Sequence, residues 1–325
     1  MSINEQLRNT FGLRRAVVVE DNELSESFPE GHPGRQFQND TTDKLHAHLA
    51  DRAAEDLRET YLQSGDHVAV GTGRGVALTA KYFGYRYLNA PLTQKLETLT
   101  ISPLTGFLSA TLWGVSASEC DASTAALDLA KGCWSCKTNN LPLSVSLDAD
   151  KRSRIPRLQR FLQHDSPLAL EQWVKPTGPK IAIVGVGSLV GGHRMLHRPA
   201  PPEIAAVAEL IDALIDYIAQ DGNPLPIGDL CNHLFVVRPD LLGKPFNTFT
   251  LETAEAKIKV INDLLITAKK EHFQQECLEK VLLVAGGEEK APTLWYVLTQ
   301  LEFAHKVILY TDSACAKQLM LLPRP

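Results

Sequence analysis

The stretch that decides the fold is Lys280-Val-Leu-Leu-Val-Ala-Gly-Gly-Glu-Glu-Lys-Ala291. Its apolar run predicts a buried strand, its glycine pair predicts a tight turn, and a helix is expected from about Glu289 to Leu301. The order of apolar strand and glycines recurs at His67–Gly75 and at Lys180–Gly187. Apolar strands that alternate with helices form parallel sheets covered on both faces. We therefore predict an α/β protein, rich in parallel sheet, with helices on both faces.

The rest of the chain extends this pattern in both directions. Apolar runs at Arg15–Val19 and Lys306–Tyr310 predict two more strands, and apolar spacing predicts helices at Asp43–Leu62 and Glu203–Ala219. No linker, repeat or low-complexity tract divides the chain, so we expect a single domain over residues 1–325. Residues 137–180 depart from the pattern, and we predict a helical insertion or the edge of a small inserted subdomain there.

The composition excludes several classes of protein. Hydrophobic residues make up 44% of the 325 residues, which is enough for a large core, and the net charge of −5 gives no basic footprint for nucleic acid. The N-terminus has no signal-peptide pattern, and no apolar run reaches the ~20 residues of a membrane span. We therefore expect a cytoplasmic protein with reduced cysteines, no nucleic-acid partner and no membrane association.

The glycine loops predict where a ligand binds, because ligands of parallel α/β sheets lie at the carboxyl ends of the strands. The loop Gly71-Thr-Gly-Arg-Gly75 can bring backbone amides and the Arg74 guanidinium to an anion at a helix N-terminus. Gly71, Gly73 and Gly75 can equally serve a tight turn that binds nothing. The spacing does not fit the Gly-X-Gly-X-X-Gly pattern of dinucleotide-binding folds, and no cofactor is expected.

The loop Gly287–Lys290 offers the best candidates for chemistry. Lys290 can bind a phosphate or carboxylate, or hold a sugar hydroxyl group. Glu288 or Glu289 can accept a hydroxyl hydrogen bond or act as a base on a carbon next to a carbonyl. The competing interpretation of both glutamates is ordinary helix-start electrostatics, because acidic side chains favour that end of a helix.

Further polar residues follow other predicted turns. Asp229 can accept hydrogen bonds from ligand hydroxyls or serve as a turn residue, and on a helix it would share a face with His233 as an acid–histidine pair suited to proton transfer. Ser188, which follows Gly187, and Thr105 can donate to a bound oxygen. Each of these two hydroxyls can equally be a helix cap or a turn residue.

Two pairs of metal-ligating residues are weak candidates. His193 and His197 have the spacing for one metal on a helix, but no third ligand lies near them in the sequence. Cys133 and Cys136 have Cys-X-X-Cys spacing, but they follow a predicted helix instead of opening one, which favours a buried structural pair over a redox site. No metal site is expected.

Taken together, the glycine loops give the chain a family resemblance. The sequence resembles the sugar-binding effector domain of SorC/DeoR-type transcription regulators over nearly its whole length. The stretches that resemble it, in the order of the family, are Phe11–Val19, Gly65–Gly75, Ile101–Gly106, Asp121–Lys131, Ile183–Ser188, Pro226–Leu230, Leu283–Ala291 and Val307–Asp312.

The resemblance implies a NagB/RpiA/CoA-transferase-like fold, a sugar, sugar phosphate or polyol at the carboxyl edge of the sheet, and a homodimer or homotetramer. It also implies ligand contacts by Asp229 and Lys290. This sequence departs from the family at Gly75, where a threonine or serine hydroxyl is usual. Regulators of the family carry a helix-turn-helix upstream, whereas about ten residues precede the entry strand here, so direct DNA binding is not expected.

Two functions remain open from the sequence. The first is a stand-alone binding protein for a sugar or sugar phosphate, which signals through an oligomer or a partner contact. The second is an enzyme of the same fold that isomerises or epimerises a small hydroxy-carbonyl compound. In the second case Glu288 or Glu289 would be the base and Lys290 would stabilise the enediolate.

Overall fold

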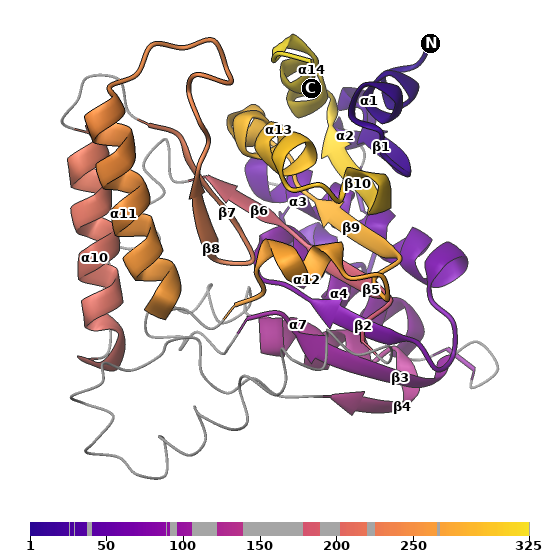
Figure 1. Ribbon diagram of the computed structural model, residues 1–325. Helices are drawn as coiled ribbons and strands as arrows, with labels where there is room; N and C mark the ends of the chain where they lie inside the picture. The colour runs from indigo at the N-terminus through magenta and orange to yellow at the C-terminus, as the bar shows by residue number, and fades with distance from the viewer. Residues whose placement is uncertain are drawn as a thin grey trace.

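In the part of the chain that the structure describes, the centre of the fold is a seven-stranded parallel sheet in the order β1-β10-β9-β5-β2-β3-β4 (Figure 1). The computed structural model describes residues 1–25, 27–28, 30–37, 41–88, 90–91, 96–105, 122–138, 178–188, 202–219, 225–264 and 267–324. The strands are β1 (Arg15–Val19), β2 (His67–Val70), β3 (Leu96–Pro103), β4 (Cys133–Thr138), β5 (Ile181–Val184), β9 (Lys280–Val284) and β10 (Val307–Asp312). The predicted parallel sheet is confirmed.

Helices cover both faces of this sheet, as predicted. Successive side chains of a strand point to opposite faces, so each strand contributes to two separate cores. In β10, Leu309 belongs to one core, whereas Ile308 and Tyr310 belong to the other. The helices over the first face are α1 (Ile3–Phe11), α12 (Lys270–Gln274), α13 (Ala291–Gln300) and α14 (Ser313–Leu321). Those over the second face are α3 (Thr41–Asp56), α4 (Arg74–Leu88) and α7 (Ala122–Ala130).

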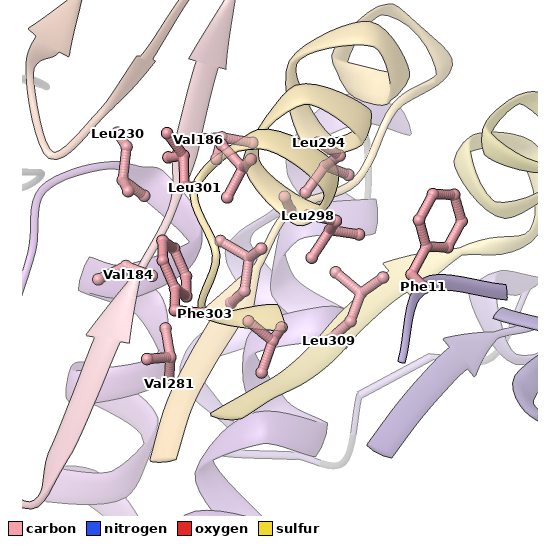
Figure 2. Packing of buried hydrophobic residues seen from close by; sticks show 14 of the residues in the cluster. Phe11, Val184, Val186, Leu230, Val281, Leu294, Leu298, Leu301, Phe303 and Leu309 are labelled. Carbon is pink, nitrogen blue, oxygen red and sulfur yellow. The ribbon is translucent and has the colours of Figure 1, made fainter. Parts of the chain in front are cut away.

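Figure 2 shows the first core, where the side chains of α13 meet the sheet. Leu294 and Leu298 of α13 are buried there together with Leu309 of β10. Phe303 is fully buried and stacks on Phe273 of α12, with the ring centroids 5.2 Å apart. Replacing a fully buried leucine by alanine typically costs about 2–5 kcal/mol, so this packing is a main source of stability.

A smaller unit stands beside the main sheet (Figure 1). Its antiparallel sheet consists of β6 (Val186–Ser188), β7 (Ile227–Leu230) and β8 (His233–Val236). The helices α10 (Pro202–Ala219) and α11 (Thr248–Leu264) share a separate core with it. The apolar run at 180–187 therefore divides at Gly185, because its first part pairs in the main sheet and its last part in the small one.

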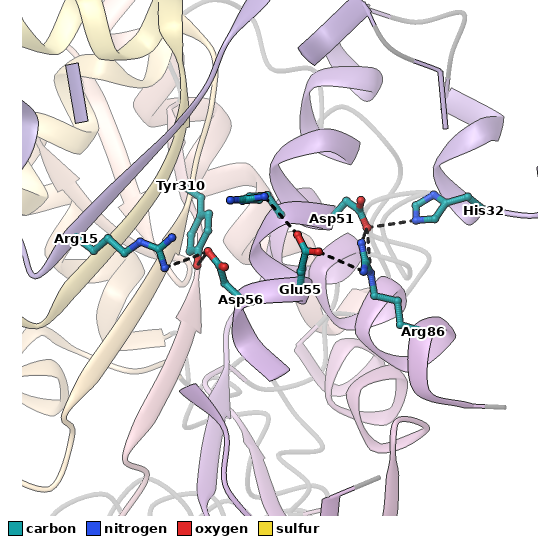
Figure 3. Close-up of polar contacts among 8 residues, drawn as sticks. Arg15, His32, Asp51, Glu55, Asp56, Arg86 and Tyr310 are labelled. Atoms are coloured by element: carbon teal, nitrogen blue, oxygen red, sulfur yellow. Dashed lines mark hydrogen bonds and ion pairs between the residues drawn. The ribbon is translucent and has the colours of Figure 1, made fainter. Parts of the chain in front are cut away.

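Two polar clusters fix α3 to its neighbours (Figure 3). In one, Asp56 accepts a hydrogen bond from the Tyr310 hydroxyl at 2.9 Å and lies 3.3 Å from Arg15. In the other, Asp51 accepts from Arg86 at 2.8 Å and lies 3.2 Å from His32. Burial opposes ionisation of Asp51, but the hydrogen bonds from His32 and Arg86 hold its pKa below the usual value.

Several boundaries differ from the sequence-based expectation. The predicted helix at 43–62 is α3 followed by a wider π-helical turn, Leu57–Tyr61, in which the Leu62 amide donates to the Leu57 carbonyl. The polar segment after β1 contains two short helices, α2 (Asp21–Ser25) and a 3-10 helix (Pro33–Phe37). Most of the insertion predicted at 137–180 lies outside the described residues and stays a prediction. None of the described helices has the length and apolar character needed to cross a bilayer.

Candidate functional site

The loops that follow β2, β5 and β9 meet at the carboxyl edge of the sheet, as expected for parallel neighbours. A side chain at Gly71 would place its Cβ 2.8 Å from the Cys231 sulfur and 3.3 Å from the Ile183 carbonyl oxygen. A Cβ at Gly75 would lie 3.3 Å from the Val284 carbonyl oxygen. Gly73 has φ +113°, which only glycine adopts without strain. These glycines therefore let the first turn of α4 pack closely against the ends of β5 and β9. The free backbone amides of that turn lie at the carboxyl edge of the sheet.

The hairpin between β7 and β8 docks on the loop after β2. Its two turn residues, Cys231 and Asn232, both have positive φ (53° and 65°), the geometry of a tight two-residue hairpin turn. The Thr72 hydroxyl donates to the Asn232 side-chain oxygen at 3.2 Å. We did not predict roles for these three residues. An asparagine between two short apolar runs was the only sequence feature that could have suggested the turn.

Asp229 lies on β7 directly opposite Gly187 of β6. A Cβ at Gly187 would lie 1.8 Å from the Asp229 Oδ2 atom, so the carboxylate occupies the space that the glycine leaves. The Asn232 backbone amide donates to Asp229 Oδ1 at 3.1 Å. Burial raises the pKa of Asp229 above its usual value, although this hydrogen bond and nearby Lys290 oppose the shift.

The predicted pairing of Asp229 with His233 on one helix face is wrong. Both residues lie in the hairpin, where Asp229 opposes Leu234 and His233 opposes Leu230. Neighbouring cross-strand pairs point to opposite faces of a sheet, so the two side chains diverge. Burial lowers the pKa of His233, and nearby Lys269 lowers it further. Periodicity over so few residues cannot distinguish a short apolar strand from a helix.

Lys290 is the cation of the loop after β9, in the 3-10 turn Glu288–Lys290. Its Nζ atom lies 3.1 Å from Nε2 of His46, a buried residue of α3. Burial lowers the pKa of Lys290, and the nearby Arg74 guanidinium lowers it further, whereas Glu289 and Asp229 act in the opposite direction. A cation and a carboxylate from two other predicted loops, Arg74 and Asp229, therefore both lie within electrostatic range of Lys290.

The loop that carries Lys290 is anchored by Asp312 at the end of β10. One carboxylate oxygen accepts from the Gly287 amide at 2.6 Å, and the other accepts from Ala314 and Cys315 at 3.0 Å each. Asp312 is the N-cap of α14, since Ala314 and Cys315 lie in the first turn of that helix. Its second contact, to Gly287, was not visible in the sequence.

Neither the comparison with protein-family models nor the comparison with curated proteins finds a match. Solved structures do match, over 98% of this chain. A DeoR family transcriptional regulator from Listeria monocytogenes is 19% identical with a TM-score of 0.60, and 98% of its chain is covered. The full-length sorbitol operon regulator SorC from Klebsiella pneumoniae is 15% identical with a TM-score of 0.57, and 80% of its chain is covered.

A domain assigned to sugar binding in a transcriptional repressor from Vibrio fischeri is 19% identical with a TM-score of 0.56, and 97% of it is covered. The chain has the SorC/DeoR regulator-domain fold. The fold that the sequence resemblance implied is therefore confirmed. In this SorC/DeoR fold, the loops after β2 and β9 and the β7–β8 hairpin meet at the carboxyl edge.

Not every predicted site residue joins this group in the SorC/DeoR fold. Glu288 and Glu289 are exposed, and only Glu289 is close enough to Lys290 to affect its pKa. Ser188 is buried on β6 and, by strand alternation, faces away from Asp229. Thr105 is buried after β3 in a bridge to Thr267, whose hydroxyl donates to the Cys231 carbonyl. The Thr105 hydroxyl has no hydrogen-bond partner among the described residues.

Of the two pairs of metal-ligating candidates, only the cysteine pair lies within the described residues. Among the described residues, no three acidic, cysteine or histidine side chains are grouped closely enough to hold an ion. Cys133 and Cys136 are free thiols on β4 at the opposite border of the sheet from β1, and Cys133 is buried. Residues 193–197, with the histidine pair, lie outside the described residues.

The arrangement suits a ligand with an anionic end and hydroxyl groups. Amides at the start of α4, with Arg74 and Lys290, can bind an anion. Asp229 can accept hydrogen bonds from hydroxyl groups of the same ligand. Gly75 supplies a backbone amide but no hydroxyl group. Anion binding at this edge therefore depends more strongly on the charges of Arg74 and Lys290.

Proposed function

We propose that this protein binds a sugar, sugar phosphate or related polyol at the carboxyl edge of its main sheet. The observation that carries the proposal is that Arg74 at the start of α4 and Asp229 of β7 both act electrostatically on Lys290, in the turn after β9, although the three residues come from separate elements. The SorC regulator from Klebsiella, named for sorbitol, and the Vibrio domain assigned to sugar binding support a sugar-like ligand.

The proposed ligand contacts both the main sheet and the small unit. Asp229 belongs to β7 of the small unit, whereas Arg74 begins α4 and Lys290 ends the 3-10 turn after β9, both at the main sheet. A ligand that contacts both would favour one arrangement of the two, and such a differential contact is what converts binding into a signal. A homodimer or homotetramer would transmit that signal, and light scattering of the purified protein measures the assembly.

The experiment is a thermal-shift screen over sugars, sugar phosphates and polyols, followed by calorimetric titration of the best ligand. A ligand at a hundred times its Kd stabilises the native state by about 2.7 kcal/mol. Lys290→Ala should remove the shift, whereas the exposed control Lys317→Ala should keep it. If no compound of these classes stabilises the protein, the proposed function is wrong.

The same ligand decides between binding and catalysis. Incubation with the protein, followed by NMR of the ligand, should return it unchanged if the protein is a binder. New signals that disappear in Lys290→Ala would favour the isomerase or epimerase alternative. Direct sequence-specific DNA binding is not expected, and a salt-resistant gel-shift complex would contradict that prediction.

A further inference from the structure

The contact between Lys290 and His46 is more specific than an anion site requires. A lysine that only binds phosphate needs its positive charge, and a second basic nitrogen beside it adds nothing to that charge. Here the Nζ atom lies 3.1 Å from the imidazole Nε2 atom, and the two residues are 244 positions apart in the chain. Only one hydrogen can lie between the two nitrogens, so one of them carries it and the other is a base.

The surroundings of Lys290 favour its neutral amine. Desolvation is the largest influence and lowers the pKa of Lys290, and the Arg74 guanidinium acts in the same direction. Lysines become nucleophiles when they are desolvated or lie next to another cation. The groups that face Lys290 are His46 from α3, Arg74 from α4, Asp229 from β7, Glu289 from its own turn and Cys315 from α14. Burial raises the pKa of Cys315 to about 12, so its thiol is neutral at physiological pH.

We propose that Lys290 and His46 form a Schiff-base site, in which the Lys290 amine condenses reversibly with the carbonyl carbon of an open-chain sugar or sugar phosphate. The substrate class rests on the proposed function, whereas the reactivity of the amine does not. A polyol has no carbonyl, so the site would distinguish aldoses and ketoses from the corresponding alcohols.

Each step balances in protons and electrons. His46 Nε2 takes a proton from the Lys290 ammonium, and the free amine attacks the carbonyl carbon. The carbonyl oxygen takes the proton back from His46, which gives a carbinolamine. His46 next moves a proton from the nitrogen to the hydroxyl oxygen. The nitrogen lone pair then expels that oxygen as water. The nitrogen–carbon double bond remains, protonated at nitrogen once more. An ammonium and a carbonyl have become an iminium and water, and His46 has returned to its first state.

The test is reductive labelling with glycolaldehyde phosphate and cyanoborohydride, which reduces an imine to a stable secondary amine, followed by peptide mass spectrometry. At neutral pH, Lys290 should be labelled faster than the exposed Lys244 and Lys317, because the lowered pKa of Lys290 leaves more of its amine free to react. 2-Hydroxyethyl phosphate, which has no carbonyl, should slow the labelling of Lys290 alone.

Lys306 is a matched control inside the same protein. Burial lowers its pKa too, but its Nζ donates to the Phe273 and Gln275 carbonyls at 3.3 and 2.7 Å instead of contacting an imidazole nitrogen. Lys306 should therefore be labelled more slowly than Lys290. Equal rates would show that burial alone accounts for the reactivity.

Two variants test the partner residues. In His46→Gln the amide oxygen accepts from the ammonium and keeps it protonated, so labelling should fall about tenfold at neutral pH and recover in alkali. Arg74→Gln should slow labelling in the same pH-dependent way, and it serves if His46→Gln fails to fold by circular dichroism. Labelling of Lys290 no faster than Lys317, or unaffected by both variants, overturns the proposal.

The two proposals fail in different ways. If sugar phosphates stabilise the protein but Lys290 is not labelled selectively, Lys290 is an ammonium that binds anions, and only the Schiff base is wrong. If Lys290 is labelled selectively but no sugar, phosphosugar or polyol stabilises the protein, the amine is reactive and the proposed function is wrong.

Discussion

Replacing Asp312 removes three backbone hydrogen bonds at once, two to the first turn of α14 and one to Gly287 in the loop that carries Lys290. Asp312 is almost fully buried, with 3% of its surface exposed, so water cannot replace the lost acceptor easily. Asn keeps one oxygen for α14 but turns an N–H group toward the Gly287 amide. Ala removes every acceptor.

The magnitudes follow from these contacts. Loss of a helix cap costs about 1 kcal/mol, and loss of a hydrogen bond to a charged group costs about 1.5–3 kcal/mol. Asp312→Asn should therefore lower the free energy of unfolding by about 2 kcal/mol, and Asp312→Ala should lower it by about 3–4 kcal/mol. With an unfolding entropy of about 2.1 cal/mol/K per residue over 325 residues, 3 kcal/mol corresponds to a fall in Tm of about 4 °C.

The assay is calorimetric unfolding of both variants, with Asp263→Asn as the control. Asp263 is exposed and forms a surface ion pair with Lys259, so its replacement should change Tm little. Hydrogen exchange should rise at Gly287 in both variants, but in α14 mainly in Asp312→Ala. Equal destabilisation by Asn and Ala, or unchanged exchange at Gly287, would refute the assignment of Asp312 as the anchor of the Lys290 loop.

Three further predictions concern other residues. Asp229→Asn should raise Tm at neutral pH, because the raised pKa of Asp229 means that its ionised form destabilises the folded state. The gain in Tm should vanish below pH ~4, where the carboxyl is protonated in the folded and the unfolded protein alike. An equal gain at pH 3 and pH 7 would argue against that cause. Asp51→Asn should lower the free energy of unfolding by about 1 kcal/mol at neutral pH, after allowance for solvent screening, and should leave it unchanged in acid. The reason is that a lowered carboxyl pKa stabilises the folded protein only above the pKa of the unfolded state, and this stability is lost as the pH falls. Urea titrations at neutral and acidic pH measure the difference. Gly187→Ala should weaken ligand binding more than Gly185→Ala, since the first Cβ displaces the Asp229 carboxylate and the second meets atoms no closer than 3.4 Å; calorimetric titration decides, and equal Kd values would contradict it.

Local sequence predicted the strands β1, β2, β5, β9 and β10 of the main sheet because each of these runs carries its own evidence, whereas β4 was not predicted. Runs such as Val281–Val284 and Val307–Tyr310 are apolar throughout and can only be buried strands or buried helices, and the glycines that follow favour strands. The same local evidence failed for β7 and β8, each of which is four residues long and alternates too briefly to show a period. That failure produced the wrong pairing of Asp229 with His233.

The sequence by itself determined the parallel α/β core, the glycine turns and the edge at which the polar loops emerge. These depend on residues that are neighbours in the chain, whose apolar or turn character is fixed before the chain folds. Tertiary structure alone decided that His46 contacts Lys290, that Asp229 fills the space left by Gly187, and that Asp312 holds Gly287. Each of these contacts joins separate elements, so it is set by how helices and strands pack, and no spacing along the chain encodes it.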